Sequence, residues 1–353
     1  MKTVVAAGHI CLDITPIFGS GAVCNINDIL KPGRLVQMNG INIHTGGSVA
    51  NTGLSLMKLG NNVKLLGKIG TDEFGQLVLS ILKQEGYEHT SDMIISPGST
   101  TSYSVVLAIP GIDRIFLHDP GANDTFCYDD IDFDAVRDAS LFHFGYPPIM
   151  KRMYADSGSE LVHIFRTAKG CDMQTSLDLA AVDPDSEAGH ADWCRILGNV
   201  LPFTDYFVPS FEELCFMIDR DRYNALSASS GDGDILSDID INKDIIPLAL
   251  SVMKMGAQVV MIKCGSKGIY YRSRTEDGFV KSYRPSKVVS ATGAGDTSIA
   301  AFLTAMLNGY SLPDSVKLAA AEGASCVEAV DALSGIRPLD ELEQKIRGGW
   351  EQN

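Results

Sequence analysis

The chain has 353 residues, a hydrophobic content of 45% and a formal net charge of −15. This length fits one large α/β domain or two domains, and the composition is ordinary for a globular protein with a buried core. The negative charge argues against nucleic acid or an anionic membrane surface as the partner. A nucleotide, which needs only a local positive potential, is compatible with it.

Targeting and redox features favour a cytoplasmic protein. No run reaches the ~18 apolar residues of a membrane span. His9 and Asp13 interrupt the apolar run at the N-terminus before it has the length of a signal peptide. The eight cysteines are scattered and include no C-x-x-C pair. We therefore expect reduced core thiols, without a disulfide or zinc framework.

The first predicted strand is the β-rich run Thr3–Ala7, which ends at Gly8. Asp13 lies just beyond it. An acidic residue at the C-terminal end of a first strand lies where open α/β sheets bind ligands. The alternative is a carboxylate that caps a turn, and the residues alone leave both interpretations open.

Residues 14–45 are predicted to leave the main sheet as short strands and turns. Alternating pieces such as 35–38 favour strands, and five turn-forming residues argue against a helix: Gly19, Gly21, Pro32, Gly33 and Gly40. A glycine pair, Gly46 and Gly47, then precedes a predicted helix that contains Asn51 and ends at Gly60. Such a pair is compatible with a tight loop or with a ligand that approaches the backbone.

Residues 100–118 are predicted to form two strands around a turn at 110–113, because their side chains alternate between two faces. The two strands belong either to a small separate sheet or to a hairpin that extends the main sheet. From Leu141 onward the pattern alternates between short apolar strands and helices. The strands are Leu141–Gly145, Thr175–Leu179, Tyr206–Val208 and Gln258–Lys263, which predicts a parallel sheet covered by helices on both faces.

Polar residues follow several of these strands. Asp178 ends one of them, and Ser210 and Glu213 have the spacing of a capping box at a helix start. Lys263 precedes a glycine loop, where it either meets a phosphate or forms a solvated strand end. The acidic stretch 227–245, which includes Asp232, lacks the spacing of a calcium loop, so a mobile surface insertion is the preferred interpretation.

The most informative stretch is Ser290–Gly309, in which a turn of small residues leads into a helix with an apolar stripe. The backbone N–H groups of Gly293, Ala294 and Gly295 and the positive end of the helix suit a phosphate or a developing anion. Asp296 lies at the first turn. It either stabilises the helix start, or accepts a proton from a substrate hydroxyl while the turn holds the phosphoryl group.

Two segments together resemble the signatures of the PfkB, or ribokinase-like, family of carbohydrate and nucleoside kinases. They are Gly46-Gly47-x-x-x-Asn51 and the Gly-Ala-Gly-Asp of 293–296. The resemblance extends over nearly the whole chain. It implies one three-layer α/β/α domain over residues 1–353, with a mostly parallel central sheet. A small β-sheet lid would come from about 14–45 and 99–119, and a homodimer could form through that lid.

The resemblance also implies the roles of single residues. Asp296 would be the general base, with the backbone of Gly293, Ala294 and Gly295 as anion hole. The sugar or nucleoside acceptor would be held by Asp13, Gly46, Gly47 and Asn51. Glu213 would organise Mg²⁺, and ATP would lie along Lys263, Gly265 and Gly268, with Glu322 near the adenine. The implied reaction is transfer of phosphate from ATP to a sugar hydroxyl.

Departures from the family pattern narrow the acceptor. Ribokinases usually have Asn and Lys where this chain has Cys11 and Ser48. Some ketosugar-acid kinases and fructokinases have Asn and Arg where it has Ala180 and Val182. The expected acceptor is therefore a neutral sugar or nucleoside, and neither ribose nor a sugar acid. Two alternatives stay open, a nucleoside kinase of the same fold and a catalytically idle sugar-binding regulatory protein.

Overall fold

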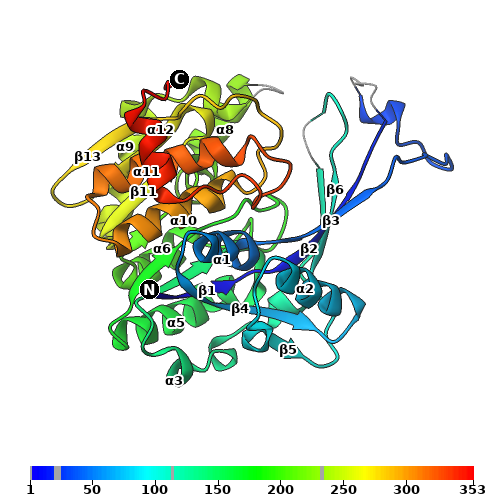
Figure 1. The fold of residues 1–353 in the computed structure, drawn as a ribbon, viewed down its shortest axis with the longest axis horizontal. Coiled ribbons are helices and arrows are strands. Elements are labelled where there is room, and N and C mark those ends of the chain that lie inside the picture. The colour runs from blue at the N-terminus through cyan, green and yellow to red at the C-terminus, as the bar shows by residue number, and fades with distance from the viewer. Residues whose placement is uncertain (1, 20–24, 113–114, 231–233) are drawn as a thin grey trace.

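Two β-sheets organise the chain in the computed structural model, which describes residues 2–19, 25–112, 115–230 and 234–353 (Figure 1). Gly21, Asp113 and Asp232, named above, lie outside these ranges. The larger sheet has nine strands in the order β13-β12-β11-β10-β9-β8-β1-β4-β5. Their bounds are β1 Thr3–Gly8, β4 Asn62–Gly70, β5 Ile94–Ser96, β8 Leu141–Gly145, β9 Gln174–Leu177, β10 Tyr206–Phe207, β11 Val259–Lys263, β12 Gly268–Arg272 and β13 Asp277–Lys281.

The pairing is parallel from β5 to β11, and the pairs β11–β12 and β12–β13 are antiparallel, so that β12 runs opposite to the other strands. The mostly parallel sheet predicted from the βα alternation is confirmed. Parallel neighbours end at the same edge of a sheet, so the loops after these strands meet there. That edge carries the candidate site.

Helices cover both faces of the large sheet. The helices are α1 Ser48–Lys58, α2 Glu73–Gln84, α3 Phe133–Val136, α4 Lys151–Tyr154, α5 Ser159–Gly170, α6 Trp193–Val200, α7 Phe211–Ile218, α8 Arg220–Ser230, α9 Ile246–Met255, α10 Ala294–Leu307, α11 Leu312–Cys326 and α12 Leu339–Arg347. None of the helices in the described ranges combines the length and the apolar character that a membrane crossing requires.

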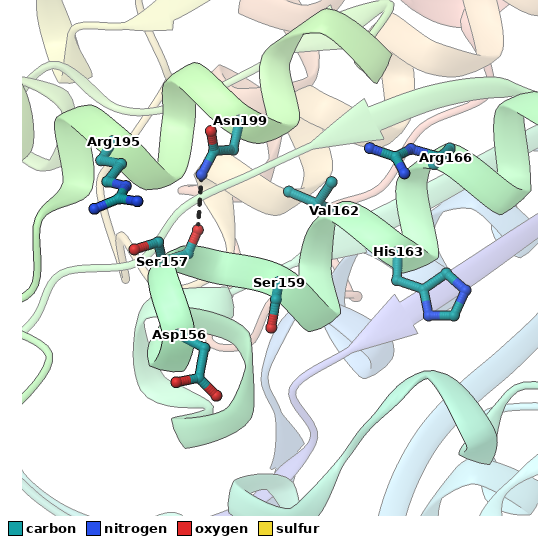
Figure 2. A pocket seen from close by; sticks show the side chains of 8 residues that line it. All are labelled: Asp156, Ser157, Ser159, Val162, His163, Arg166, Arg195 and Asn199. Atoms are coloured by element: carbon teal, nitrogen blue, oxygen red, sulfur yellow. Dashed lines mark hydrogen bonds between the residues drawn. The ribbon is translucent and has the colours of Figure 1, made fainter.

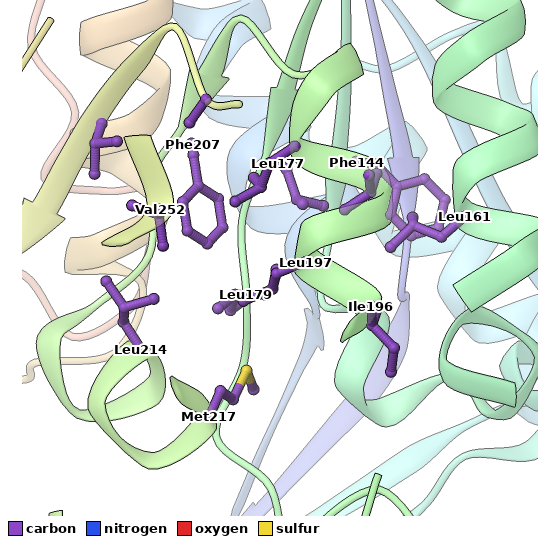
Figure 3. Packing of buried hydrophobic residues seen from close by; sticks show 14 of the residues in the cluster. Phe144, Leu161, Leu177, Leu179, Ile196, Leu197, Phe207, Leu214, Met217 and Val252 are labelled. Atoms are coloured by element: carbon purple, nitrogen blue, oxygen red, sulfur yellow. The ribbon is translucent and has the colours of Figure 1, made fainter. Parts of the chain in front are cut away.

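Side chains on each strand point alternately to the two faces of the large sheet, and this produces two hydrophobic cores. On β1, Val5 and Ala7 face the core built with α5, α6 and α9, whereas Val4 and Ala6 face the core built with α1, α10 and α11. Figure 3 shows part of the first core, which contains Phe144 and Leu177 of the strands and Leu161 of α5. The three-layer α/β/α arrangement is therefore a direct result of strands that are apolar on both sides.

The second sheet has four strands in the order β3-β2-β6-β7. They are β2 Cys11–Pro16, β3 Ile41–Gly46, β6 Tyr103–Leu107 and β7 Ile115–Asp119. Residues 100–118 therefore build a separate small sheet, and the alternative of a hairpin that extends the main sheet is wrong. In Figure 1 this sheet extends away from the rest of the molecule.

Two local expectations need correction. Residues 35–38 form no strand, so alternation alone was misleading there. Asp13 lies inside β2, paired with His44 of β3, and not at the end of the first strand. The cause is that the chain passes from the large sheet to the small one within two residues of Gly8.

Residues 234–245 of the acidic stretch also differ from the expected mobile surface insertion. Leu236 and Ile245 are buried in the first core. Asp244 is buried and accepts a hydrogen bond from Arg222 Nε at 2.6 Å. Lys267 Nζ donates to the carbonyl of Ser237 at 2.7 Å. The apolar residues interspersed among the acids anchor this part to the body of the protein.

Candidate active site

The site forms where the carboxyl ends of β8, β9 and β11 meet the start of α10. Tyr146 follows β8 directly, Asp178 follows β9, and Lys263 is the last residue of β11. Gly293 begins α10 with a φ of 78°, a left-handed conformation that glycine adopts without strain. A Cβ on Gly293 would also collide with Ala332. The glycine is therefore required both by the turn and by its neighbour.

Asp296 is buried at the first turn of α10 and accepts hydrogen bonds from three side chains. Asn51 Nδ2 donates to Oδ2 at 3.1 Å and Thr52 Oγ1 donates to Oδ1 at 3.1 Å. The Tyr146 hydroxyl lies 2.9 Å from each of the two oxygens. These partners come from α1 and the turn after β8, so the carboxylate ties three separate parts of the chain together at one point.

Burial raises the pKa of Asp296, while the Lys263 ammonium and the donors Tyr146, Asn51 and Thr52 act in the opposite direction. A carboxylate with a raised pKa is a stronger base than an exposed aspartate. The pKa of Tyr146 is also raised, by burial and by the nearby carboxylates Asp296 and Asp178. Its phenol therefore stays protonated and remains a donor.

Lys263 lies beside the turn that was predicted to bind an anion. Its Nζ is 2.8 Å from Asp178 Oδ1, and the two side chains are only 13% and 2% exposed. A Cβ built on Gly295 would lie 3.6 Å from the same Nζ. The interpretation of Lys263 as a solvated strand end is therefore wrong, and its positive charge lies next to the start of α10.

The electrostatics around Lys263 favour its charged form. Burial by itself would lower the pKa of Lys263, but Asp178 and Glu213 outweigh it and the pKa is raised. Burial raises the pKa of Asp178 to about 8, against the opposing effect of Lys263. The pair keeps a positive charge in a site that is otherwise rich in carboxylates.

The glycine pair brings Asp13 and His9 against the backbone of the loop before α1. A Cβ on Gly46 would overlap the Asp13 carboxylate. A Cβ on Gly47, where φ is +83°, would lie 2.7 Å from His9 Nδ1. Asp13 and His9 thus explain why both positions are glycine. Burial raises the pKa of Asp13, and the Cys11 thiol donates to it at 3.4 Å.

The region between Asp13 and Asp296 holds several rings that the sequence did not single out. The ring centroid of His9 is 5.1 Å from that of His118 and 6.2 Å from that of Tyr146. Burial, together with His118, holds the pKa of His9 well below its ordinary value, so this imidazole is neutral. An uncharged His9 ring therefore lies beside Tyr146, the residue that donates to Asp296.

Tyr146 is the important residue that the sequence analysis missed. A signal was present, because it directly follows an apolar strand of a parallel sheet, as Asp178 does. The Pro147-Pro148 pair behind it also marks a constrained turn. Tyrosine is a common core residue, however, so its type alone does not indicate a site.

The predicted metal and nucleotide residues occupy distinct environments. Glu213 Oε2 accepts the Ser210 N–H at 2.9 Å, and the capping box at the start of α7 is confirmed. Gly265 and Gly268 both have positive φ, as the expected tight loop requires. Glu322 is fully buried and accepts the backbone N–H of Arg337 at 3.2 Å. Burial raises the pKa of Glu322 to about 8.

The residues present suit a magnesium ion that arrives with phosphates. Across the described ranges no group of three or more His, Cys, Asp or Glu side chains is arranged to hold a metal by itself. Magnesium in phosphoryl-transfer sites is bound by one or two carboxylates together with the phosphates of the substrate. Glu213, electrostatically coupled to Lys263 and Asp178, is a carboxylate of that kind.

A separate hollow of about 570 Å³ lies on the face formed by α5 and α6 (Figure 2). It is lined by Asp156, Ser157, Ser159, Val162, His163, Arg166, Arg195 and Asn199. None of these residues was predicted to bind a ligand. His163 stacks on Tyr128 at 3.6 Å and Arg166 lies over Phe203 at 5.1 Å, so part of its basic lining is already engaged.

A buried carboxylate, a lysine and a glycine-rich helix start at the carboxyl edge of a parallel sheet define an α/β phosphotransferase. The sequence matches the pfkB family carbohydrate kinase description over residues 5–337. The chain belongs to this family and is a sugar kinase, an enzyme that transfers phosphate to an alcohol group.

Known proteins agree with this assignment. An uncharacterized sugar kinase of Archaeoglobus fulgidus is 26% identical over 80% of this chain and 98% of its own length. Fructokinase-1 of Zea mays is 24% identical over 98% of both chains. A putative ribokinase II of E. coli, solved with ATP and Mg²⁺, superposes with a TM-score of 0.73 and 20% identity over 99% of this chain and 100% of its own.

Proposed function

We propose that this protein transfers the γ-phosphoryl group of ATP to a hydroxyl of a neutral sugar, with Asp296 as general base. One observation carries the proposal. The Lys263 ammonium lies beside Gly295 at the start of α10 and acts electrostatically on the buried Asp296 carboxylate, the next residue of the helix. A base and positive charge at one point serve a reaction in which a hydroxyl loses a proton while its oxygen attacks phosphorus.

The proposed step follows from these positions. The acceptor oxygen forms a bond to the γ-phosphorus, and the bond from this phosphorus to the β–γ bridging oxygen breaks to release ADP. The hydroxyl proton passes to Asp296. The backbone of Gly293, Ala294 and Gly295 and the side chain of Lys263 balance the negative charge on the phosphoryl oxygens. Catalysis then consists mainly of positioning and charge stabilisation.

We assign the nucleotide and the metal to the residues on the β11 side of the site. ATP would lie along Lys263, Gly265 and Gly268, and Glu213 would hold the hydrated Mg²⁺. When bound, the ion neutralises charge on the phosphates. Glu322 is buried and accepts a hydrogen bond from the backbone of Arg337. It would therefore contribute to adenine binding indirectly, by supporting the residues that line the nucleotide site.

We assign the acceptor to Asp13, Gly46, Gly47 and Asn51. Asp13 is a strong acceptor for sugar hydroxyls, and the neutral His9 ring beside it offers no positive charge to a carboxylate substrate. A sugar acid would face Asp13 without a compensating cation, and like charges in a closed site repel by several kcal/mol. The maize relative is named a fructokinase, so fructose is the first compound to test.

A screen across substrates tests this function directly. Purified protein with Mg-ATP is given fructose, ribose, 2-keto-3-deoxygluconate, adenosine and inosine, and phosphorylated products are measured. We expect a neutral sugar to give the highest kcat/KM, because hydroxyl-bonding sites discriminate strongly. If ribose or the keto acid leads by about tenfold or more, this account of the pocket is wrong.

We also propose that the protein forms a homodimer through the small sheet. Its outer strands β3 and β7 expose Ile41 by 54%, Ile43 by 37%, Phe116 by 55% and Leu117 by 54%. Exposed apolar side chains on a sheet edge favour association with another chain. We expect light scattering to report a dimer for the natural protein and a monomer for the Ile41→Lys, Leu117→Lys variant. A natural protein that is monomeric at micromolar concentration would contradict the proposal.

A further inference from the structure

Tyr146 is held in an unusual backbone conformation directly over the candidate base. Its φ of 66° and ψ of 38° are left-handed, a conformation that is unfavourable for a bulky L-residue. The following Pro147 and Pro148 are buried and begin a short 3₁₀-helix. The hydroxyl that results from this turn lies 2.9 Å from both oxygens of Asp296. The strained turn therefore serves to place one hydroxyl on one carboxylate.

Three side chains donate hydrogen bonds to Asp296 in this arrangement. Thr52 donates to Oδ1 and Asn51 donates to Oδ2. The Tyr146 hydroxyl has one hydrogen, which the two carboxylate oxygens share, because its oxygen lies 2.9 Å from each of them. Asn51 and Thr52 are buried neighbours on α1 and hold the carboxylate against the helix. Tyr146 is the partner on the side of His9, where the acceptor is proposed to bind.

A base in contact with Mg-ATP carries a risk, because water can replace the sugar as nucleophile. In that side reaction a water oxygen attacks the γ-phosphorus, the bond to the β–γ bridging oxygen breaks, and the water proton passes to Asp296. ATP is then lost as ADP and inorganic phosphate. A water molecule that approaches the carboxylate between its two oxygens must displace the Tyr146 hydroxyl, which lies 2.9 Å from both of them.

Resting on the proposed function, we propose that Tyr146 is a positioning residue that reserves Asp296 for the sugar hydroxyl. Before the acceptor binds, the phenol excludes water from the base. When the acceptor binds, its hydroxyl takes one carboxylate oxygen and Tyr146 keeps the other. The discrimination between sugar and water thus depends on one hydroxyl, which is supplied by the turn after β8.

The first experiment compares ATP hydrolysis without any acceptor, using Mg-ATP alone as the probe. We expect the Tyr146→Phe variant to hydrolyse ATP at least about fivefold faster than the natural protein, because water gains access to a positioned base. Adding Asp296→Asn to this variant should abolish the increase. Equal hydrolysis rates in the Tyr146→Phe variant and the natural protein would overturn the proposal.

A matched control is the Tyr270→Phe variant. Tyr270 is a buried tyrosine whose hydroxyl donates to Asp277 at 3.0 Å, away from Asp296. The same chemical change there should leave acceptor-free hydrolysis unchanged. An equal rise in both variants would show a general loosening of the protein and would count against the proposal.

A second experiment needs no turnover and is therefore independent of the proposed function. The carboxyl ¹³C signal of Asp296, assigned by its loss in the Asp296→Asn variant, is titrated with pH in the natural protein and in Tyr146→Phe. The phenol stabilises the ionised carboxylate, so its removal should raise the pKa of Asp296. An unchanged titration would overturn the contact. If no compound in the screen is phosphorylated but the pKa of Asp296 rises in Tyr146→Phe, the sugar-kinase step is rejected and the contact between Tyr146 and Asp296 stands.

Discussion

Two carboxylates occupy one site in this protein, and their surroundings differ. Asp296 lies at the start of α10, fixed by hydrogen bonds from Asn51, Thr52 and Tyr146. Asp13 lies on β2 of the small sheet, where the donors near it include the Cys11 thiol at 3.4 Å. Burial raises the pKa of both groups. The two carboxylates therefore differ in their hydrogen-bond donors more than in their burial.

This difference suggests that the two carboxylates have different roles in the reaction. A carboxylate that fixed donors hold in place is pre-organised, and rigid placement is what proton transfer requires. The donors to Asp13 include the Cys11 thiol, which is weak, and the Ser104 hydroxyl. Two such donors leave lone pairs of Asp13 for the hydroxyls of a ligand. Asp13 is also carried by a sheet that extends away from the body (Figure 1). This difference supports the proposed roles, proton transfer for Asp296 and recognition of the acceptor for Asp13.

The largest effect is expected at Asp296. Asp296→Asn should lower kcat by ~10²-fold or more, the usual contribution of a positioned base. The KM for the acceptor should change much less, because the amide keeps the shape of the carboxylate. Steady-state kinetics on the best acceptor from the screen check both values. A kcat within about threefold of the natural protein would remove Asp296 from the role of base.

The opposite pattern is expected at Asp13. Asp13→Asn should raise the KM for the acceptor by ~10-fold, because a hydrogen bond to a charged group contributes roughly 1.5–3 kcal/mol. The kcat at saturating acceptor should stay within about threefold, since proton transfer is left intact. The same kinetic experiment measures both. A large loss of kcat with an unchanged KM would erase the proposed division between the two carboxylates.

A smaller effect is expected at Glu213. Glu213→Gln should raise the magnesium concentration for half-maximal rate by roughly threefold, because the carboxylate would act on hydrated metal. A glutamine oxygen can still accept the Ser210 N–H, so the start of α7 is preserved. The matched control is Glu212→Gln on the same helical turn. Indistinguishable magnesium titrations of the natural protein and the Glu213→Gln variant would leave Glu213 only its role at the helix start.

The smallest effect is expected from monovalent cations. The segment before the anion-binding turn begins with Ser290 and Ala291, and neutral residues supply few hard anionic oxygens for a cation. Replacing sodium by potassium at constant ionic strength should change the rate by less than about twofold. An increase of several-fold would mean that backbone carbonyls of this loop suffice to bind the ion.

Much of the fold could be predicted because it follows local patterns. Short apolar runs located five strands of the large sheet: β1, β8, β9, β10 and β11. The glycine-rich turn before Asp296 located the start of α10, since few other residue types fit Gly293 beside Ala332. Local patterns failed at residues 35–38, because a short alternating segment without a pairing strand stays irregular. They also failed at residues 234–245, because burial of Leu236 and Ile245 depends on partners far away in sequence.

The sequence by itself determined the residue types that phosphoryl transfer requires, and the turns that present them. It fixed Asp296 at a helix start and Lys263 at a strand end, because both follow from local periodicity and glycine placement. Only the tertiary structure decided what these groups touch. It paired Lys263 with Asp178, 85 residues away in sequence, and set Tyr146 on Asp296 across 150 residues. Such contacts depend on which strands are neighbours in the sheet, and neighbouring strands are chosen by packing of the whole core rather than by any local segment.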